Sequence, residues 1–312
     1  MDKPECGPRD VIMKTVRSGI CGSDVSGIGI DKDAEYGHET AGYLTEVGSE
    51  VKSLDVGNRV FINPMEACPT GRSMMLGGFS EYIRVPDAEL GKSIYLLPDG
   101  LSYDEAALIE PFAVGTHGKN VPNAKPGDHV VVYGVGTIGL SCISGLCAQG
   151  INPVAIVRND TKRALLEKMG AVVCNISEVD EFEFLKEVFG ESTGRVGFPV
   201  LDIDIVVDCA GAPNIVDDFL RMQKRFSQLS VVGVNMNPTP VPLVQVMSSE
   251  VIIRGSCAYD DADIREVIDN LASGRTYMKE IITHHYKLDD IQEALTMAAD
   301  RKQAIKVVID ME

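Results

Sequence analysis

The sequence lacks the features that mark membrane-spanning and secreted proteins. Its apolar runs all fall well short of the roughly 20 residues that a membrane span needs. The opening residues, MDKPECGP, are polar and do not resemble a signal peptide. The eight cysteines are scattered, and none forms a Cys-x-x-Cys pair. We therefore expect a cytoplasmic protein whose thiols are reduced and mostly buried.

Positive charge is also scarce. Lys and Arg number 29 against 46 Asp and Glu, so the net charge is −17. Nucleic acid phosphates and anionic membrane surfaces repel such a chain, and neither is an expected partner. The charge favours solubility and carries no information about the fold.

What the sequence has is the composition of a two-domain globular protein. Its 312 residues are 45% hydrophobic and 24% charged, which is ordinary for a chain with a large core. In the first third, short alternating stretches separated by Gly and Pro predict β-strands. We expect these strands at residues 10–20, 36–47, 56–63 and 77–85. Residues 284–309 follow a strand, helix, strand pattern and are expected to rejoin this β-rich part.

Helical signals begin near residue 101. Residues 101–113 predict a helix, with Ser102 and Glu105 spaced as a capping box. From residue 130 onwards, short apolar strands alternate with helices, which predicts a parallel sheet covered by helices on both faces. The expected strands are 130–133, 153–157, 203–209 and 229–234, and the expected helices are 138–149, 161–169 and 215–222.

A glycine-rich stretch joins the first of these strands to its helix. It reads HVVVYGVGTIGL and contains Gly134, Gly136 and Gly139 in G-x-G-x-x-G spacing. Such glycines permit a tight turn and close approach of the backbone to a pyrophosphate, which the following helix N-terminus binds. The strand-to-helix context favours this dinucleotide site over an ordinary Gly-rich turn. The other expected cofactor-binding residues are Thr137, Ile138 and Gly233.

The end of the second strand of this region bears on the choice of cofactor. NAD-binding domains place an acidic residue there for the ribose 2′-hydroxyl. In this sequence the position falls on Val157 or Arg158, and neither is a carboxylate. Arg158 suits the 2′-phosphate of NADP, so NADP is favoured over NAD. Asp160 is a rival, but we expect it to cap the helix that begins near Thr161.

Four residues carry the donor types that zinc prefers, namely thiolate, imidazole and carboxylate. Cys21 lies in a Gly-rich loop, His38 and Glu39 begin a predicted strand, and Glu110 lies on a predicted helix. Each has an ordinary alternative, because a lone cysteine is usually in the core and a lone glutamate is usually at the surface.

The motifs around these four residues resemble those of zinc-dependent medium-chain dehydrogenases, the alcohol dehydrogenase family. The matching stretches are Gly-Ile-Cys21-Gly-Ser23-Asp24 and Gly-His38-Glu39. IEPFAV at residues 109–114 resembles the segment that carries a glutamate in the sorbitol, threonine and butanediol dehydrogenase branch. The tail ITHHYKLDDIQEAL is similar to the C-terminal segment of the family, and the resemblance covers nearly the whole chain.

The resemblance implies roles for these residues. Cys21 and His38 would bind a catalytic Zn²⁺ directly, and Glu39 or Glu110 would complete its coordination. The resemblance also implies supporting roles for two residues that follow Cys21 in the sequence. Asp24 would orient the His38 ring, and Ser23 would contact the substrate hydroxyl and pass on its proton, although both also suit an ordinary turn.

The sequence departs from the family pattern in places. Between residues 61 and 77 its single cysteine is Cys68, so a four-cysteine structural zinc site is not expected there. The spacer from Cys21 to His38 is short, and an initial strand is expected to be absent. These missing segments would affect the walls of the substrate cleft and the contacts between subunits. For the assembly itself, the family resemblance implies a homodimer or homotetramer.

Together these observations predict a mixed α/β protein. A GroES-like β-rich catalytic domain is expected at residues 1–117 and 255–312, with a Rossmann doubly wound domain at 118–254. The resemblance implies hydride transfer between NAD(P) and a small polyol, diol or secondary alcohol, or the matching ketone. Two alternatives remain, a zinc-free quinone or enone reductase of the same fold and a non-catalytic nucleotide-binding protein.

Overall fold

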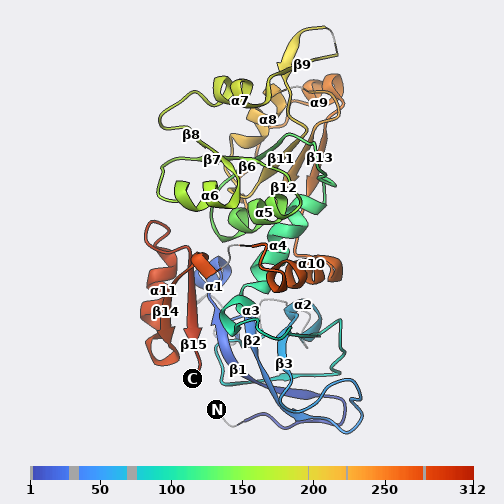
Figure 1. Cartoon of the computed structure of the whole chain (residues 1–312), viewed down its shortest axis with the longest axis vertical. Coiled ribbons are helices and arrows are strands. Elements are labelled where there is room, and N and C mark those ends of the chain that lie inside the picture. The colour runs from blue at the N-terminus through green and yellow to red at the C-terminus, as the bar shows by residue number, and fades with distance from the viewer. Residues whose placement is uncertain (1–2, 28–34, 69–75, 196, 223, 277–278) are drawn as a thin grey trace. The chain divides into compact units, whose positions relative to one another are not determined.

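The structure is a computed structural model that describes residues 3–27, 35–68, 76–195, 197–222, 224–276 and 279–312. The chain forms two compact units, both visible in Figure 1. Unit 1 combines the two ends of the chain, Met1–Pro111 and Ile264–Glu312, and unit 2 is the middle, Phe112–Asp263. The mixed α/β class and the return of the C-terminal segment to the first sheet agree with the sequence prediction.

In its described residues, unit 1 is built on a seven-stranded sheet in the order β14-β15-β1-β2-β3-β5, with β4 also paired to β1. All its pairs are antiparallel except β14 with β15. The strands are β1 Val11–Gly19, β2 Glu39–Val47, β3 Arg59–Ile62, β4 Tyr82–Val85, β5 Ile94–Leu96, β14 Ile282–Lys287 and β15 Lys306–Asp310. Strand β1 is central, because its last residues pair with both β15 and β2.

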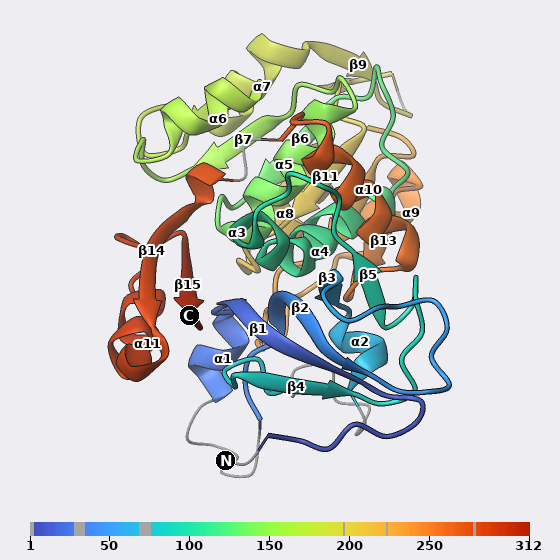
Figure 2. The ribbon, with the colours of Figure 1, turned by 60° about the horizontal axis from the view of Figure 1, so that its bottom comes forward.

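Short helices accompany this sheet. They are α1 Gly22–Gly27, α2 Pro64–Ala67, α3 Tyr103–Ala107 and α11 Ile291–Ala299, with 3₁₀ turns η1 Lys279–Ile281 and η2 Leu288–Asp290. Figure 2 shows α11 beside β14 and β15, against which it packs. Two helices, α4 Ile109–Asn120 and α10 Asp261–Ala272, continue across the boundaries of unit 1.

The predicted helix at 101–113 is two helices. The capping box is present, since the Ser102 side chain accepts from the Glu105 amide and Glu105 accepts from the Ser102 amide. The chain turns at Leu108 and starts α4, which runs on to Asn120 rather than ending at 113. Pro111 is tolerated because it lies in the first turn, where its missing N–H has no helical partner.

Strands β2, β3 and β4 begin later than the sequence pattern suggests, and β3 starts at Arg59 instead of residue 56. Strand β2 starts at Glu39 instead of residue 36, and β4 starts at Tyr82 instead of residue 77. Gly37 and Gly77 explain the delay, because their φ values of 87° and 75° lie in the left-handed region, outside extended geometry.

In its described residues, unit 2 is built on a parallel six-stranded sheet in the order β13-β12-β11-β6-β7-β8. Numbered from β6, this is the 3-2-1-4-5-6 order of a Rossmann domain. The strands are β6 Val130–Tyr133, β7 Val154–Val157, β8 Val172–Asn175, β11 Ile205–Asp208, β12 Gln228–Val231 and β13 Ile252–Gly255. The helices are α5 Thr137–Ala148, α6 Arg163–Met169, α7 Glu181–Phe189, α8 Ile215–Met222 and α9 Leu243–Ser249. A small hairpin pairs β9 Glu191–Thr193 with β10 Pro199–Leu201.

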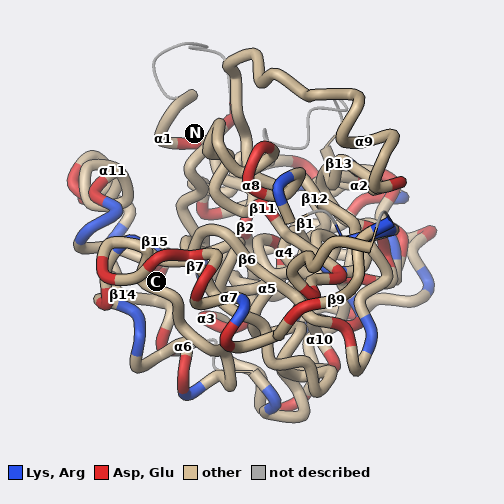
Figure 3. Tube along the Cα trace, turned by 90° about the horizontal axis from the view of Figure 1, so that it is seen from above, with Lys and Arg blue, Asp and Glu red and all other residues tan. Residues whose placement is uncertain are grey.

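The central strands β6, β7 and β11 are buried along their whole length. This explains why they read as continuous apolar runs instead of alternating ones. None of the helices in the described ranges is long and apolar enough to cross a membrane. Acidic residues, red in Figure 3, occur on elements of both units with basic residues among them.

Candidate functional site

The predicted metal donors meet where β1 ends and β2 begins. Cys21 follows β1, His38 precedes β2, and Glu39 is the first residue of β2. Because the two strands are antiparallel with Gly19 opposite Glu39, these two ends lie side by side. The ligand atoms of Cys21, His38 and Glu39 all lie within 4.8 Å of one another. A thiol, an imidazole and a carboxylate so grouped match the donors of a zinc site.

Asp24 ties together the two loops that carry these donors. Its carboxylate is buried, and it accepts from the Cys21 amide at 2.8 Å and from the Gly37 amide at 3.1 Å. The same carboxylate lies 3.6 Å from Nδ1 of His38, which is beyond a direct hydrogen bond. The structure thus brings Asp24 next to His38, but its short contacts are to the backbone of the two loops.

The electrostatics of this group favour a cation. Burial alone lowers the pKa of His38, but Asp24, Cys21 and the charge of Glu110 outweigh burial and raise the pKa to about 11. The surroundings therefore stabilise positive charge at this imidazole. A bound metal ion would take the place of that proton, as metal binding to histidine requires. The donor set and its charge together fit zinc.

Glu110 is not in the close donor group, although its charge acts on a member of it, His38. It is buried in the first turn of α4, and its charge acts on both His38 and Lys306. The described donors within 4.8 Å of one another include Glu39 and not Glu110. Of the two carboxylates that the sequence leaves open, the geometry therefore favours Glu39.

Lys306 was missed by sequence reasoning. It is the first residue of β15, is almost fully buried, and donates to the two carboxylate oxygens of Glu39 at 2.7 and 2.6 Å. It also donates to the Ile20 carbonyl at 3.0 Å. A lysine within the apolar tail IKVVI is a usable signal, because a buried ammonium needs a partner.

Ser23 lies beside the donors, in α1. Its Oγ is buried and has no hydrogen-bond partner among the described residues. Buried hydroxyls in proteins are normally paired, so an unpaired one next to a metal-donor group suits a substrate hydroxyl or a water molecule.

The glycine motif of unit 2 forms the predicted tight turn between β6 and α5. Gly134 has φ of 89°, and a Cβ on Gly139 would lie 1.9 Å from the Gly134 carbonyl oxygen. Gly136 is the N-cap of α5, makes no side-chain capping bond, and would have open space around a Cβ. Helix α5 therefore begins directly after a close-packed glycine loop and without a side-chain cap, as a pyrophosphate site requires.

Gly233 lies across from this turn, in the loop that follows β12. A Cβ there would lie 2.2 Å from the amide nitrogen of Gly211, which is in the loop after β11. Thr137 and Ile138 are the first two residues of α5. The structure thus brings the glycine motif and the start of α5 together at the carboxyl ends of the parallel strands, where such sheets bind ligands.

Arg158 directly follows β7 and its side chain is exposed. The expectation that Asp160 caps the next helix is wrong. Helix α6 begins at Arg163, and the Asp160 carboxylate is in an ion pair with Arg163 at 2.7 Å. Lys162, which the sequence reasoning did not single out, donates to the Val135 carbonyl at 2.8 Å and so places a cation at the glycine turn.

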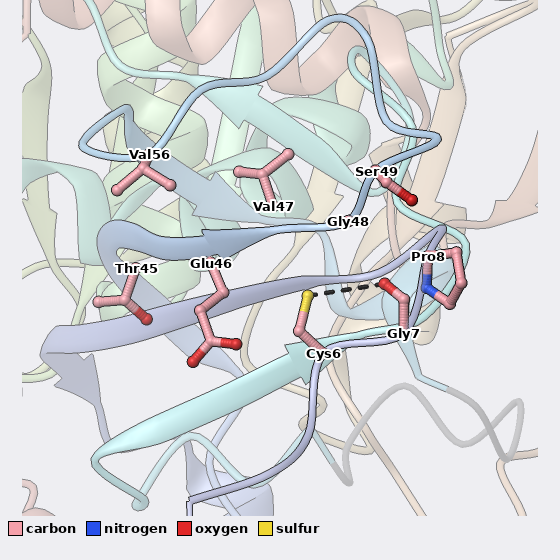
Figure 4. Close-up of a pocket in the computed structure, with 9 residues that line it drawn as sticks. All are labelled: Cys6, Gly7, Pro8, Thr45, Glu46, Val47, Gly48, Ser49 and Val56. Atoms are coloured by element: carbon pink, nitrogen blue, oxygen red, sulfur yellow. Dashed lines mark hydrogen bonds between the residues drawn. The ribbon is translucent and has the colours of Figure 1, made fainter.

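A separate surface hollow in unit 1 involves none of these residues. Figure 4 shows it beside Cys6, Glu46 and Val56. The Cys6 thiol donates to the Asp10 carbonyl at 3.4 Å, and burial together with nearby carboxylates raises its pKa. A thiol that stays protonated is a poor nucleophile or ligand, so the hollow has no evident chemistry.

Comparison with known families and proteins gives matches over most of the chain. Residues 7–99 match the family described as alcohol dehydrogenase GroES-like domain, and residues 137–273 match the zinc-binding dehydrogenase family. Sorbitol dehydrogenase of Bacillus subtilis is 30% identical over 98% of this chain and 91% of its own length.

Solved structures share the fold. A putative zinc-binding dehydrogenase from Sinorhizobium meliloti 1021, bound to NADP, superposes with a TM-score of 0.84 at 26% identity, covering 100% of this chain and 94% of that one. An alcohol dehydrogenase from Escherichia coli CFT073, complexed with NADH, superposes with a TM-score of 0.85 at 25% identity. The match covers 100% of this chain and 94% of that one.

Proposed function

The chain belongs to the zinc-type medium-chain dehydrogenase family, in the branch of the sorbitol dehydrogenases, and on that basis we propose the reaction and the site that performs it. The reaction is hydride transfer between a nicotinamide dinucleotide and a small polyol, diol or secondary alcohol, or the matching ketone. Its relatives are polyol and diol oxidoreductases. The observation that carries the site is the close group of a thiol, an imidazole and a carboxylate at Cys21, His38 and Glu39.

In this proposal Cys21, His38 and Glu39 hold one catalytic zinc. Zinc supplies a Lewis acid that polarises the substrate oxygen, and the nicotinamide accepts or returns the hydride. Ser23 would relay the proton of the substrate hydroxyl, accepting it at Oγ while releasing its own hydroxyl proton to water, since this Oγ is buried with no partner among the described residues. Asp24 keeps the Cys21 and His38 loops in register through its bonds to the two backbone amides.

The dinucleotide binds in unit 2, with its pyrophosphate at the start of α5. Gly134, Gly136 and Gly139 allow the approach, and Thr137, Ile138 and Gly233 line it. We favour NADP over NAD because exposed Arg158 follows β7 where an acidic residue would select NAD, and because Asp160 is held by Arg163. The cofactors of the two structural relatives differ, so the choice rests on Arg158.

The proposal includes a single zinc per chain. A structural zinc of the four-cysteine type needs closely spaced thiols, and residues 61–77 contain Cys68 alone. The zinc stoichiometry therefore tests both the catalytic centre and the missing structural site.

A homodimer is the assembly that the surface of unit 2 supports. Strand β13 is an edge of its sheet, and all four of its residues are exposed. Apolar side chains of the preceding segment are also exposed, namely Val234, Met236, Leu243, Val244 and Met247. An open edge flanked by apolar side chains is normally covered, and a second copy meets it with a matching edge. Light scattering at twice the chain mass would support this, and a monomer that stays monomeric at high concentration would refute it.

The deciding experiment is elemental analysis of protein purified without chelator, followed by turnover on a panel of polyols and secondary alcohols with both dinucleotides. About one zinc per chain and zinc-dependent turnover are expected. Activity on quinones or enones without zinc would favour the zinc-free reductase. Bound zinc without turnover on any alcohol would favour the non-catalytic nucleotide-binding protein.

A further inference from the structure

We propose that Tyr36 is a positioning residue for Ser23, which acts by fastening the last residue of helix α1 to the segment that leads into His38. The inference rests on the proposed function, in which Ser23 relays the proton of the substrate hydroxyl. It adds a residue that holds this serine in place beside the metal donors.

Helix α1 is tied to the segment before β2 at two points. Near its start, the buried carboxylate of Asp24 accepts from the Gly37 amide at 3.1 Å. At its last residue, the Gly27 carbonyl accepts from the hydroxyl of Tyr36. The Tyr36 ring also lies on this glycine, since a Cβ at Gly27 would be 2.8 Å from the ring edge. Ser23 is next to the first tie and about one turn from the second.

A helix as short as α1 depends on such ties. It has six residues, and a helix of this length is not stable by itself in water. The last carbonyls of a helix have no partner within it, and Tyr36 supplies one for Gly27. In so short a helix, loosening the last turn also loosens the residues around Ser23.

The position of the Ser23 hydroxyl depends on its helix. Its Oγ is buried and has no partner among the described residues, so no side-chain hydrogen bond of its own fixes it. A proton relay works only within hydrogen-bond reach of the group whose proton it takes, and a displacement of about 1 Å can cost about a hundredfold in rate. The tie at Tyr36 therefore bears on turnover and not on folding alone.

Packing alone does not explain a tyrosine at residue 36. The side chain is only half-buried, and a phenylalanine ring would cover Gly27 equally well. What tyrosine adds is a hydroxyl, which reaches the end of α1 nine positions earlier in the sequence. This bond joins the segment of Cys21 to the segment of His38, as the bonds of Asp24 do.

The test combines steady-state kinetics with hydrogen exchange of α1 in the purified protein. Tyr36→Phe removes the hydroxyl and keeps the ring. It should lower kcat by about ten- to a hundredfold, with the KM of the alcohol and the zinc content near the parent values. Without substrate, the α1 amides should exchange about 2- to 10-fold faster, because one hydrogen bond is lost. Tyr43→Phe alters another half-buried tyrosine, in β2, and should change none of these measurements.

A double-variant comparison shows whether Tyr36 acts through Ser23. In a Ser23→Ala background, adding Tyr36→Phe should lower kcat no further, while the α1 amides should still exchange faster. Equal loss of kcat in both backgrounds would overturn the proposal.

Gly27→Ala tests the same contact from the side of the helix. Its Cβ would push the Tyr36 ring away from the end of α1. It should therefore reproduce the loss of kcat, although alanine by itself favours a helix more than glycine does. Parent kcat together with slower exchange of α1 in this variant would count against the proposal.

Two results for Tyr36→Phe would also overturn it. An unchanged kcat would show that Ser23 does not depend on Tyr36, whatever the exchange rates. A loss of zinc in proportion to kcat would mean that Tyr36 acts on the metal donors instead. Failure of the proposed function is distinct from both, because the parent protein itself would then show no zinc-dependent turnover.

Discussion

The proposed metal centre of unit 1 and the proposed dinucleotide turn of unit 2 are built by opposite means. The residues of the metal centre come from three separate segments, which carry Cys21, the adjacent pair His38 and Glu39, and Lys306, and each contributes a specific side-chain atom. The dinucleotide turn is one continuous segment that depends on the absence of side chains. A Cβ added at Gly139 would clash with the Gly134 carbonyl oxygen, only 1.9 Å away. The first site should therefore fail when a side chain is shortened, and the second when one is added.

The largest expected effect is the loss of a zinc donor. Cys21→Ser or His38→Ala should abolish stoichiometric zinc and reduce turnover by about a thousandfold or more, because a Lewis acid contributes several kcal/mol to such a reaction. Dinucleotide binding, measured by fluorescence titration, should stay near the parent value since its residues lie on another sheet. Full zinc and activity in either variant would remove that residue from the site.

The converse prediction concerns Gly139. Gly139→Ala forces its Cβ against the Gly134 carbonyl, and such overpacking costs about 1–3 kcal/mol. Dinucleotide affinity should fall by about ten- to a hundredfold, while zinc content stays at the parent value.

Gly136→Ala is the matched control for this prediction, since nothing lies within 4 Å of its added Cβ. It should leave the melting temperature unchanged, and it should still weaken dinucleotide binding, because the pyrophosphate is proposed to approach the backbone at Gly136. Unchanged dinucleotide binding in Gly139→Ala would mean that the turn is not the binding site.

The same contrast explains what was predictable from sequence. The glycine motif is contiguous and its physical requirement is local, so the turn between β6 and α5 could be placed from the pattern alone. The capping box at Ser102 was likewise local and correct. The zinc donors were assigned from family motifs, because nothing in their own neighbourhoods marks Cys21 or Glu39 as a ligand.

Lys306 shows what the pattern could not supply. Its contact with Glu39 spans 267 positions in sequence and exists only because β1 lies between β15 and β2. Strand order and register are tertiary properties that no local window contains. The helix predicted to end at residue 113 also differs, because α4 continues to Asn120 with Pro111 accommodated in its first turn.

The variant Asp24→Asn tests whether the metal donors depend on the hydrogen bonds by which Asp24 links the Cys21 and Gly37 loops. Asp24→Asn retains one acceptor oxygen where the carboxylate uses two, one for the Cys21 amide and one for the Gly37 amide. Zinc affinity should fall by about tenfold, at the lower end of the range for outer partners, with dinucleotide binding unchanged. Chelator competition measures the affinity, and an unchanged value would show that the loops hold the donors without this cross-link.

An effect no larger than that of Asp24→Asn is expected at Arg158. This residue is the exception to the contrast above, because here the proposed dinucleotide site uses a side chain. A charge-assisted hydrogen bond is worth about 1.5–3 kcal/mol, and exposure places Arg158 at the low end. Arg158→Asp should therefore lower the kcat/KM ratio of NADP to NAD by about tenfold, without changing zinc content. Arg301→Asp makes the same charge change at an exposed position of unit 1 and should leave the ratio alone. If both variants shift the ratio equally, overall charge governs the preference, and the dinucleotide site is built from backbone alone.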